Sequence, residues 1–272
     1  MDLWVLWLLA FLRAMGVCFS APVLNTSFVP LQVKIALAAV LSFIGYTFMG
    51  YTFRALDVLP DAVAGSVGSQ SVSALMLAGA EEVGLGLLMG FGAGLALVAV
   101  HIAGHFIDIE LGLGMVQVLE PGSSRSVPLA GNLFYLLALA ILLETNQHHM
   151  VIAGFMESLR RFPPGKNLGL GRLTGASIAL ALPAALDLFS GAFAAGIKMS
   201  LPVVGCLFIA TALLGVLSRA VPQMNVFMVG IPVKALLGFF LLGLAMPSYA
   251  SFMSGLVEEV PRALWTVMRA WG

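Results

Sequence analysis

The chain has 272 residues, of which 60% are hydrophobic and only 10% are charged. Soluble globular proteins carry about a quarter charged residues, so this composition predicts an integral membrane protein. The 13 basic residues balance 13 acidic ones, which argues against a binding surface for nucleic acid or for an acidic partner.

Six apolar tracts are candidates for crossing a membrane, which takes about 20 residues of helix. They cover residues 3–24, 31–53, 83–102, 129–143, 173–217 and 231–246, with polar connections expected at residues 54–82 and 155–172. The fifth tract is too long for one span and contains Pro183 and Pro202, so we expect two helices or one strongly broken helix. The predicted fold is an all-α polytopic membrane protein with about six or seven apolar helices, several of them broken.

The first tract resembles a secretion signal, because the sequence CFSA at residues 18–21 is similar to a cleavage site. A signal would begin with basic residues, however, and here the first charge is Asp2 and Arg13 lies inside the apolar run. We therefore expect a retained membrane helix. Both cysteines, Cys18 and Cys206, lie in apolar tracts and are expected to be buried, reduced thiols.

The third tract contains a glycine face made of Gly86, Gly90 and Gly94. Residues spaced by four share one side of a helix, and small residues there let membrane helices approach closely. The sequence leaves two alternatives for the helix that packs against this face: another helix of the same chain or a helix of another subunit.

The segment GHFIDIELGLGMVQVLEPG, residues 104–122, places three carboxylates among four glycines and a proline. Ionisable groups are costly inside a membrane and usually face a bundle interior or water, so we expect this segment to have a functional role. His101, His105 and Asp108 share one helix face. A zinc-protease helix would need a glutamate at position 102, which is isoleucine, so a polar seam is expected rather than a metal site.

The remaining sequence contains neither a nucleophile with its base nor a phosphate-binding loop, so we expect no enzyme activity and no cofactor. Four basic residues in the connection at residues 155–172 indicate the cytoplasmic side of the membrane. Residues 250–272 mix charged and large apolar side chains, which predicts an amphipathic helix at an interface or on a partner.

Four stretches, in order along the chain, resemble the FliR family of flagellar type III export-gate proteins and, more distantly, its counterparts in virulence secretion. The stretch FLRAMG around Arg13, followed by two prolines and Lys34, resembles the opening of that family. AGHFIDIELGLGM with EPGSSRSVP resembles its central segment, although Glu120 replaces the usual aspartate, and TNQHHMVI resembles its NGH stretch. SRAVPQMNVFMVGIPVKALLGF, residues 218–239, is the most specific match and favours the flagellar branch.

The resemblance implies a core subunit of the export gate in the bacterial inner membrane, at the flagellar basal body. It implies that FliP and FliQ form a channel with this chain, that FlhB associates with them, and that unfolded flagellar proteins pass through as substrates. It also implies a FliP-like helical part at residues 1–175 and a FliQ-like C-terminal helical hairpin with an amphipathic tail at residues 176–272. No metal or other cofactor is implied.

The resemblance assigns a plug to residues 106–122, which would close the channel, and a partner-binding tip to the C-terminal hairpin, which would dock FlhB. The plug residues are Phe106, Asp108, Glu110, Gly112, Gly114, Met115, Val116, Glu120 and Pro121, with the three carboxylates facing the aqueous path. The residues of the hairpin tip are Arg219, Pro222, Asn225, Phe227, Gly230, Pro232 and Lys234, in a turn between two apolar helices.

The residues alone leave a second class of protein open. Broken helices with charges near the membrane midplane also bind substrates and ions in secondary transporters. Transporters usually have internally repeated halves, and we find no such repeat in this sequence. An intramembrane metalloenzyme is a more distant third reading.

Overall fold

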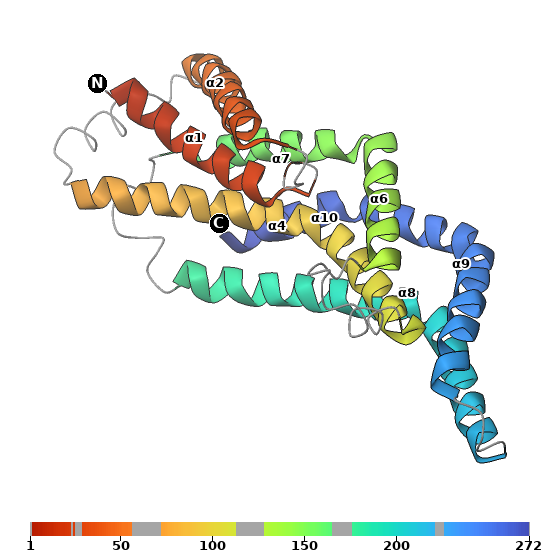
Figure 1. The fold of residues 1–272 in the computed structure, drawn as a ribbon. Helices are drawn as coiled ribbons and strands as arrows, with labels where there is room; N and C mark the ends of the chain where they lie inside the picture. The colour runs from red at the N-terminus through yellow and green to blue at the C-terminus, as the bar shows by residue number, and fades with distance from the viewer. Residues whose placement is uncertain are drawn as a thin grey trace. The chain divides into compact units, whose positions relative to one another are not determined.

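The computed structural model describes residues 2–22, 24, 29–55, 72–112, 128–164, 176–220 and 226–271 (Figure 1). All regular elements in these ranges are α-helices, so the all-α prediction is confirmed. They are α1 (Asp2–Ser20), α2 (Leu31–Ala55), α4 (Val72–Leu111), α6 (Leu129–Glu144), α7 (Gln147–Arg161), α8 (Ala176–Ala220), α9 (Val226–Glu258) and α10 (Val260–Trp271).

Three stretches of the described chain are long and apolar enough to cross a membrane: Leu75–Leu111, Leu182–Ala220 and Val229–Ala270. Helices α6 and α7 make a fourth if they are counted as one broken span. The chain is therefore a polytopic membrane protein, as its composition predicts.

Several expected boundaries are wrong. Helix α4 begins at Val72, so the last part of the expected connection at residues 54–82 is helical. The tract with Pro183 and Pro202 is one helix, α8, rather than two helices or a strongly broken one. Neighbouring helices and local adjustments let membrane helices keep such prolines, and α9 likewise contains Pro232 and Pro247.

The described chain divides into two compact units, each built from separate stretches of sequence. The first unit comprises Met1–Leu95, Asn146–Phe189 and Glu259–Gly272, and the second comprises Ala96–Thr145 and Ser190–Glu258. Helices α4 and α8 contribute residues to both units. The division into FliP-like and FliQ-like parts is a different claim, based on resemblance, and it stays a prediction.

In the first unit, α1 and α4 run parallel and pack closely. Leu9 packs against Ala78, and further along the helices Gly16 lies against Gly86. Helix α10 packs on α7, with Leu264 and Val267 buried and Arg161 lying 4.5 Å from the ring centre of Trp265. The amphipathic helix therefore begins at Val260 rather than at residue 250, and Leu264, Val267 and Met268 on its apolar side are buried within this chain, while Trp265 is partly exposed.

In the second unit, α6 contacts α9, where the rings of Phe134 and Tyr249 lie 5.0 Å apart. The C-terminal part of α8 and the N-terminal part of α9 lie side by side as a hairpin (Figure 1). Large apolar side chains of this hairpin are exposed, and Leu236 is 73% exposed. Cys206 is also exposed, so the expectation that both cysteines are buried holds only for Cys18.

Candidate functional site

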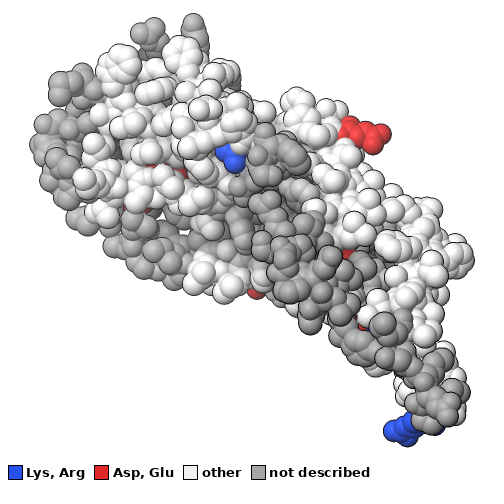
Figure 2. Space-filling view, in the orientation of Figure 1, with Lys and Arg blue, Asp and Glu red and all other residues white. Residues whose placement is uncertain are grey.

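Ionisable side chains inside apolar helices are the strongest candidates for function, because a charge is kept in a membrane only where something stabilises it. Few charged side chains are visible among the described residues of the face drawn in Figure 2. Two polar clusters stand out, one in each compact unit.

The cluster of the first unit is centred on Arg13, which is 1% exposed. Its Nε donates a hydrogen bond to Oε2 of Glu82 at 2.5 Å, and the two groups form an ion pair. Nη1 donates to Oγ of Ser158 at 3.2 Å, and Nη2 donates to the carbonyl oxygen of Phe162 at 2.8 Å. One side chain of α1 thereby holds α4 and the C-terminal end of α7.

This arrangement depends on the planar fork of a guanidinium group, which aims several donors in fixed directions. Sequence reasoning missed the cluster because it placed Glu82 in a polar connection and used Arg13 only as an argument against a cleaved signal and as part of a family motif. The sequence signal that could have predicted this cluster is the lone positive charge of Arg13 within an apolar run, since such a charge needs a buried partner.

The glycine face packs against α1. A Cβ added at Gly86 would collide with the backbone of Arg13, and one added at Gly90 would lie 2.9 Å from the carbonyl oxygen of Val17. Gly94 has more room, with its nearest neighbour, the carbonyl oxygen of Ser20, at 3.6 Å. Of the two partners left open by the sequence, the structure places another helix of the same chain against Gly86 and Gly90.

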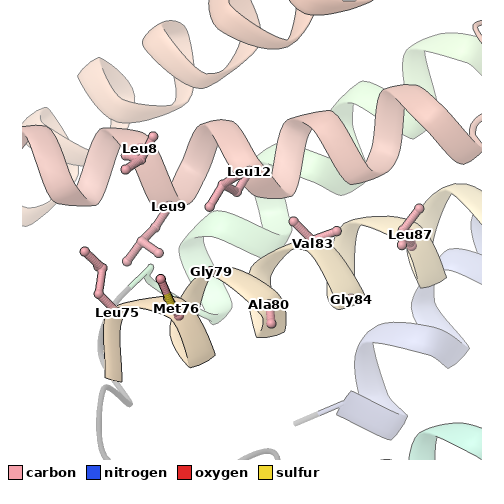
Figure 3. Close-up of a pocket in the computed structure, with 10 residues that line it drawn as sticks. All are labelled: Leu8, Leu9, Leu12, Leu75, Met76, Gly79, Ala80, Val83, Gly84 and Leu87. Atoms are coloured by element: carbon pink, nitrogen blue, oxygen red, sulfur yellow. The ribbon is translucent and has the colours of Figure 1, made fainter. Parts of the chain in front are cut away.

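An open cavity of about 530 Å³ lies between α1 and α4 in the first unit (Figure 3). It is lined by Leu8, Leu9 and Leu12 from α1 and by Leu75, Met76, Gly79, Ala80, Val83, Gly84 and Leu87 from α4. Binding sites for small polar molecules need a few convergent polar groups, and these lining side chains supply none. The cavity therefore suits an apolar occupant.

The second cluster lies at the C-terminal end of α4, where the plug is expected to begin. Asp108 is buried, its Oδ1 accepting a hydrogen bond from the N–H of Ala130 at 2.9 Å and its Oδ2 one from the N–H of Gly131 at 3.0 Å. These are free N–H groups in the first turn of α6, and Pro128 before that helix provides no side-chain cap. Asp108 thus caps α6, and the expectation that it faces an aqueous path is wrong.

Glu110 joins α4 to the α8–α9 hairpin. Its Oε1 accepts a hydrogen bond from Nζ of Lys234 at 3.2 Å and another from Oγ1 of Thr211 at 2.9 Å. We call Glu110, Thr211 and Lys234 the clasp. The sequence placed Glu110 in the plug and Lys234 in the hairpin tip, and the structure brings these two residues together.

Beside the clasp, Leu111 packs so closely on Gly238 that a Cβ added there would collide with the Leu111 side chain. Helix α4 ends at Leu111, and the next residue, Gly112, has a φ of 74° in the left-handed region that favours glycine. The first residues of the expected plug are therefore held as a helix end. Phe106 is also in α4, with its ring 6.5 Å from that of Phe193.

The other predicted residues divide between described and undescribed parts of the chain. Gly114, Met115, Val116, Glu120, Pro121, Pro222 and Asn225 lie outside the described residues. Arg219 is exposed near the end of α8, whereas Phe227, Gly230, Pro232 and Lys234 belong to α9. The expected turn at residues 218–234 is therefore mostly helix, because α8 continues to Ala220 and α9 begins at Val226.

The histidines of α4 and the carboxylate that shares their face have other neighbours in the structure. The ring of His101 lies 6.1 Å from that of Tyr135, and both oxygens of Asp108 are occupied by backbone N–H groups. Within the described ranges, no group of three or more His, Cys, Asp or Glu side chains is placed to hold a metal ion.

Comparison with known proteins gives one family and several full-length relatives. The family model described as bacterial export proteins, family 1, matches residues 4–260. The flagellar biosynthetic protein FliR of Escherichia coli (strain K12) is 28% identical over 263 residues, which cover 95% of this chain and 92% of the relative. The proteins of the same name from Bacillus subtilis (strain 168) and Aquifex aeolicus (strain VF5) are each 30% identical, over 89% and 93% of this chain and 86% and 89% of their own lengths.

Proposed function

Because this chain belongs to family 1 of the bacterial export proteins, we propose that it is a membrane subunit of the flagellar protein-export apparatus. The observation that carries this proposal is the match to flagellar FliR proteins over almost the whole of both chains. The long apolar helices support a position within the membrane.

We further propose that the chain acts in the inner membrane, at the flagellar basal body, as a core subunit of the export gate. FliP and FliQ form the channel with it, FlhB associates with the assembly, and unfolded flagellar proteins are the cargo. The exposed apolar side chains of the α8–α9 hairpin support a role within an assembly, because other subunits would cover them.

In this role the chain provides structure and performs no catalytic step. The clasp and the Asp108 cap hold residues 106–112, the start of the expected plug, against the α8–α9 hairpin and α6. A fixed helix end of this kind suits the wall of a channel better than its moving part.

The test is a strain that lacks this chain, complemented with the wild-type chain carrying an affinity tag. Flagellar subunits should reach the medium only in the complemented strain, and purification in mild detergent should recover FliP and FliQ with the tagged chain. Normal secretion without the chain would contradict the proposal. Recovery of the chain as a small homo-oligomer would favour the transporter instead.

A further inference from the structure

Helix α8 presents an exposed seam on the side opposite its buried face. In the second unit, Gly196, Met199, Ser200, Val203 and Leu207 of α8 are buried. At about 100° per residue, the opposite side of the helix carries residues at alternating spacings of three and four. We call this set the lysine seam: Gly191, Ala194, Lys198, Leu201, Gly205, Phe208, Ala212 and Gly215. The spacing matches the a and d positions of a coiled coil, where one helix packs along another.

The backbone of this seam is open to close approach. A Cβ added at Gly191, Gly205 or Gly215 would meet no atom within 4 Å, so no described part of the chain lies against these positions. Small residues favour helix contacts in membranes, but they do not by themselves distinguish a protein partner from lipid.

Lys198 favours a protein partner over lipid on this seam. Its side chain is exposed, and no hydrogen bond or ion pair joins it to another described residue. The nearest charged residues along the chain are Asp187 and Arg219, so the ammonium group stands alone in a long apolar stretch. Such a charge requires a compensating group, and a single lysine at an a position also fixes the register of a helix pair.

We propose that the lysine seam receives a membrane helix of another export-apparatus subunit, and that this helix carries a carboxylate at the level of Lys198. A second copy of the chain, paired symmetrically at this level, would bring two ammonium groups together. Charge complementarity therefore favours a different subunit. This inference rests on the proposed function and deepens it, since it names the contact face and the chemistry of the partner.

The test combines charge changes with photo-crosslinking in the complemented strain. Lys198→Glu should reduce the recovery of the contacting subunit at least about tenfold while the level of the chain itself stays unchanged, because the residue is exposed. Lys198→Arg should behave as wild type. Arg269→Glu, the same charge reversal at an exposed position of α10 outside the lysine seam and the hairpin tip, is the matched control and should retain the subunit.

A photo-reactive residue at Leu201 should crosslink to a membrane helix of that subunit that contains Asp or Glu. Changing this carboxylate to Lys should restore the association lost in Lys198→Glu. Normal recovery with Lys198→Glu, crosslinks to lipid only, or crosslinks to a second copy would each overturn the inference. If secretion still depends on the chain in those cases, the proposed function stands; if secretion does not depend on it, the proposed function fails as well.

Discussion

Helices α4 and α8 are both long, apolar and able to cross a membrane, yet their surroundings differ. Within an 18-residue apolar stretch of each helix, 67% is buried within the chain for α4, against 17% for α8. Glu82, Asp108 and Glu110 of α4 have partners in the chain, whereas Lys198 of α8 has none among the described residues. Hydropathy alone therefore does not tell which helix is covered by its own chain. That is shown by whether the charged side chains and glycines of the helix contact other residues of the chain.

The largest expected effect comes from breaking the buried ion pair of α4. Arg13→Met leaves the carboxylate of Glu82 buried without a partner, which should lower the free energy of unfolding by about 3–5 kcal/mol. The measurement is thermal unfolding of the purified chain in detergent, together with its amount in the membrane. Arg13→Met combined with Glu82→Met should recover most of the loss, and equal losses in both variants would show that the pair itself is unimportant.

The second prediction compares glycines on the two helices. Gly90→Leu should destabilise the isolated chain by about 1–3 kcal/mol, because the new side chain meets the backbone of Val17 and Ala21. Gly205→Leu on α8 is the matched control and should leave the unfolding temperature of the isolated chain unchanged, since nothing lies within 4 Å. Equal sensitivity at both positions would contradict the contrast between the helices.

The third prediction concerns the cap provided by Asp108. Asp108→Asn keeps the size of the side chain, but an amide has one oxygen to accept the two N–H groups of α6. The expected cost is about 1–2 kcal/mol in the same unfolding measurement. Asp108→Glu tests the geometry, since it keeps the charge on a longer side chain. An unchanged stability in Asp108→Asn would mean that the cap contributes nothing.

The smallest expected effect is at the clasp, where the side chains of Lys234 and Glu110 are 17% and 22% exposed. Partial exposure weakens an ion pair, so Glu110→Gln should cost about 1 kcal/mol or less. A double-mutant cycle with Lys234→Met isolates the pair term. A coupling energy of zero would mean that the Glu110–Lys234 pair does not stabilise the chain. The packing of Leu111 on Gly238 would then be the contact that holds α4 to the hairpin.

The helical class, the membrane location and the export family could be predicted from the sequence, because apolar tracts and local motifs carry that information. The boundary of α4 could not, because a carboxylate at position 82 reads as the edge of an apolar tract unless its pairing with Arg13 is known. The role of Glu110 was hidden for the same reason. Its partner Lys234 is 124 residues away in the sequence, beyond any periodicity.

The discontinuous first unit has a consequence for biosynthesis. Helix α10 is synthesised after α4 and α7, yet its Leu264 lies against Gly154 of α7 and its Val267 against Gly92 of α4. The earlier helices of this unit are therefore made with this surface uncovered, and it stays uncovered until α10 has been synthesised. A nascent chain arrested before residue 259 should be a preferred substrate for membrane proteases, since its N-terminal helices lack the part of their core that α10 supplies.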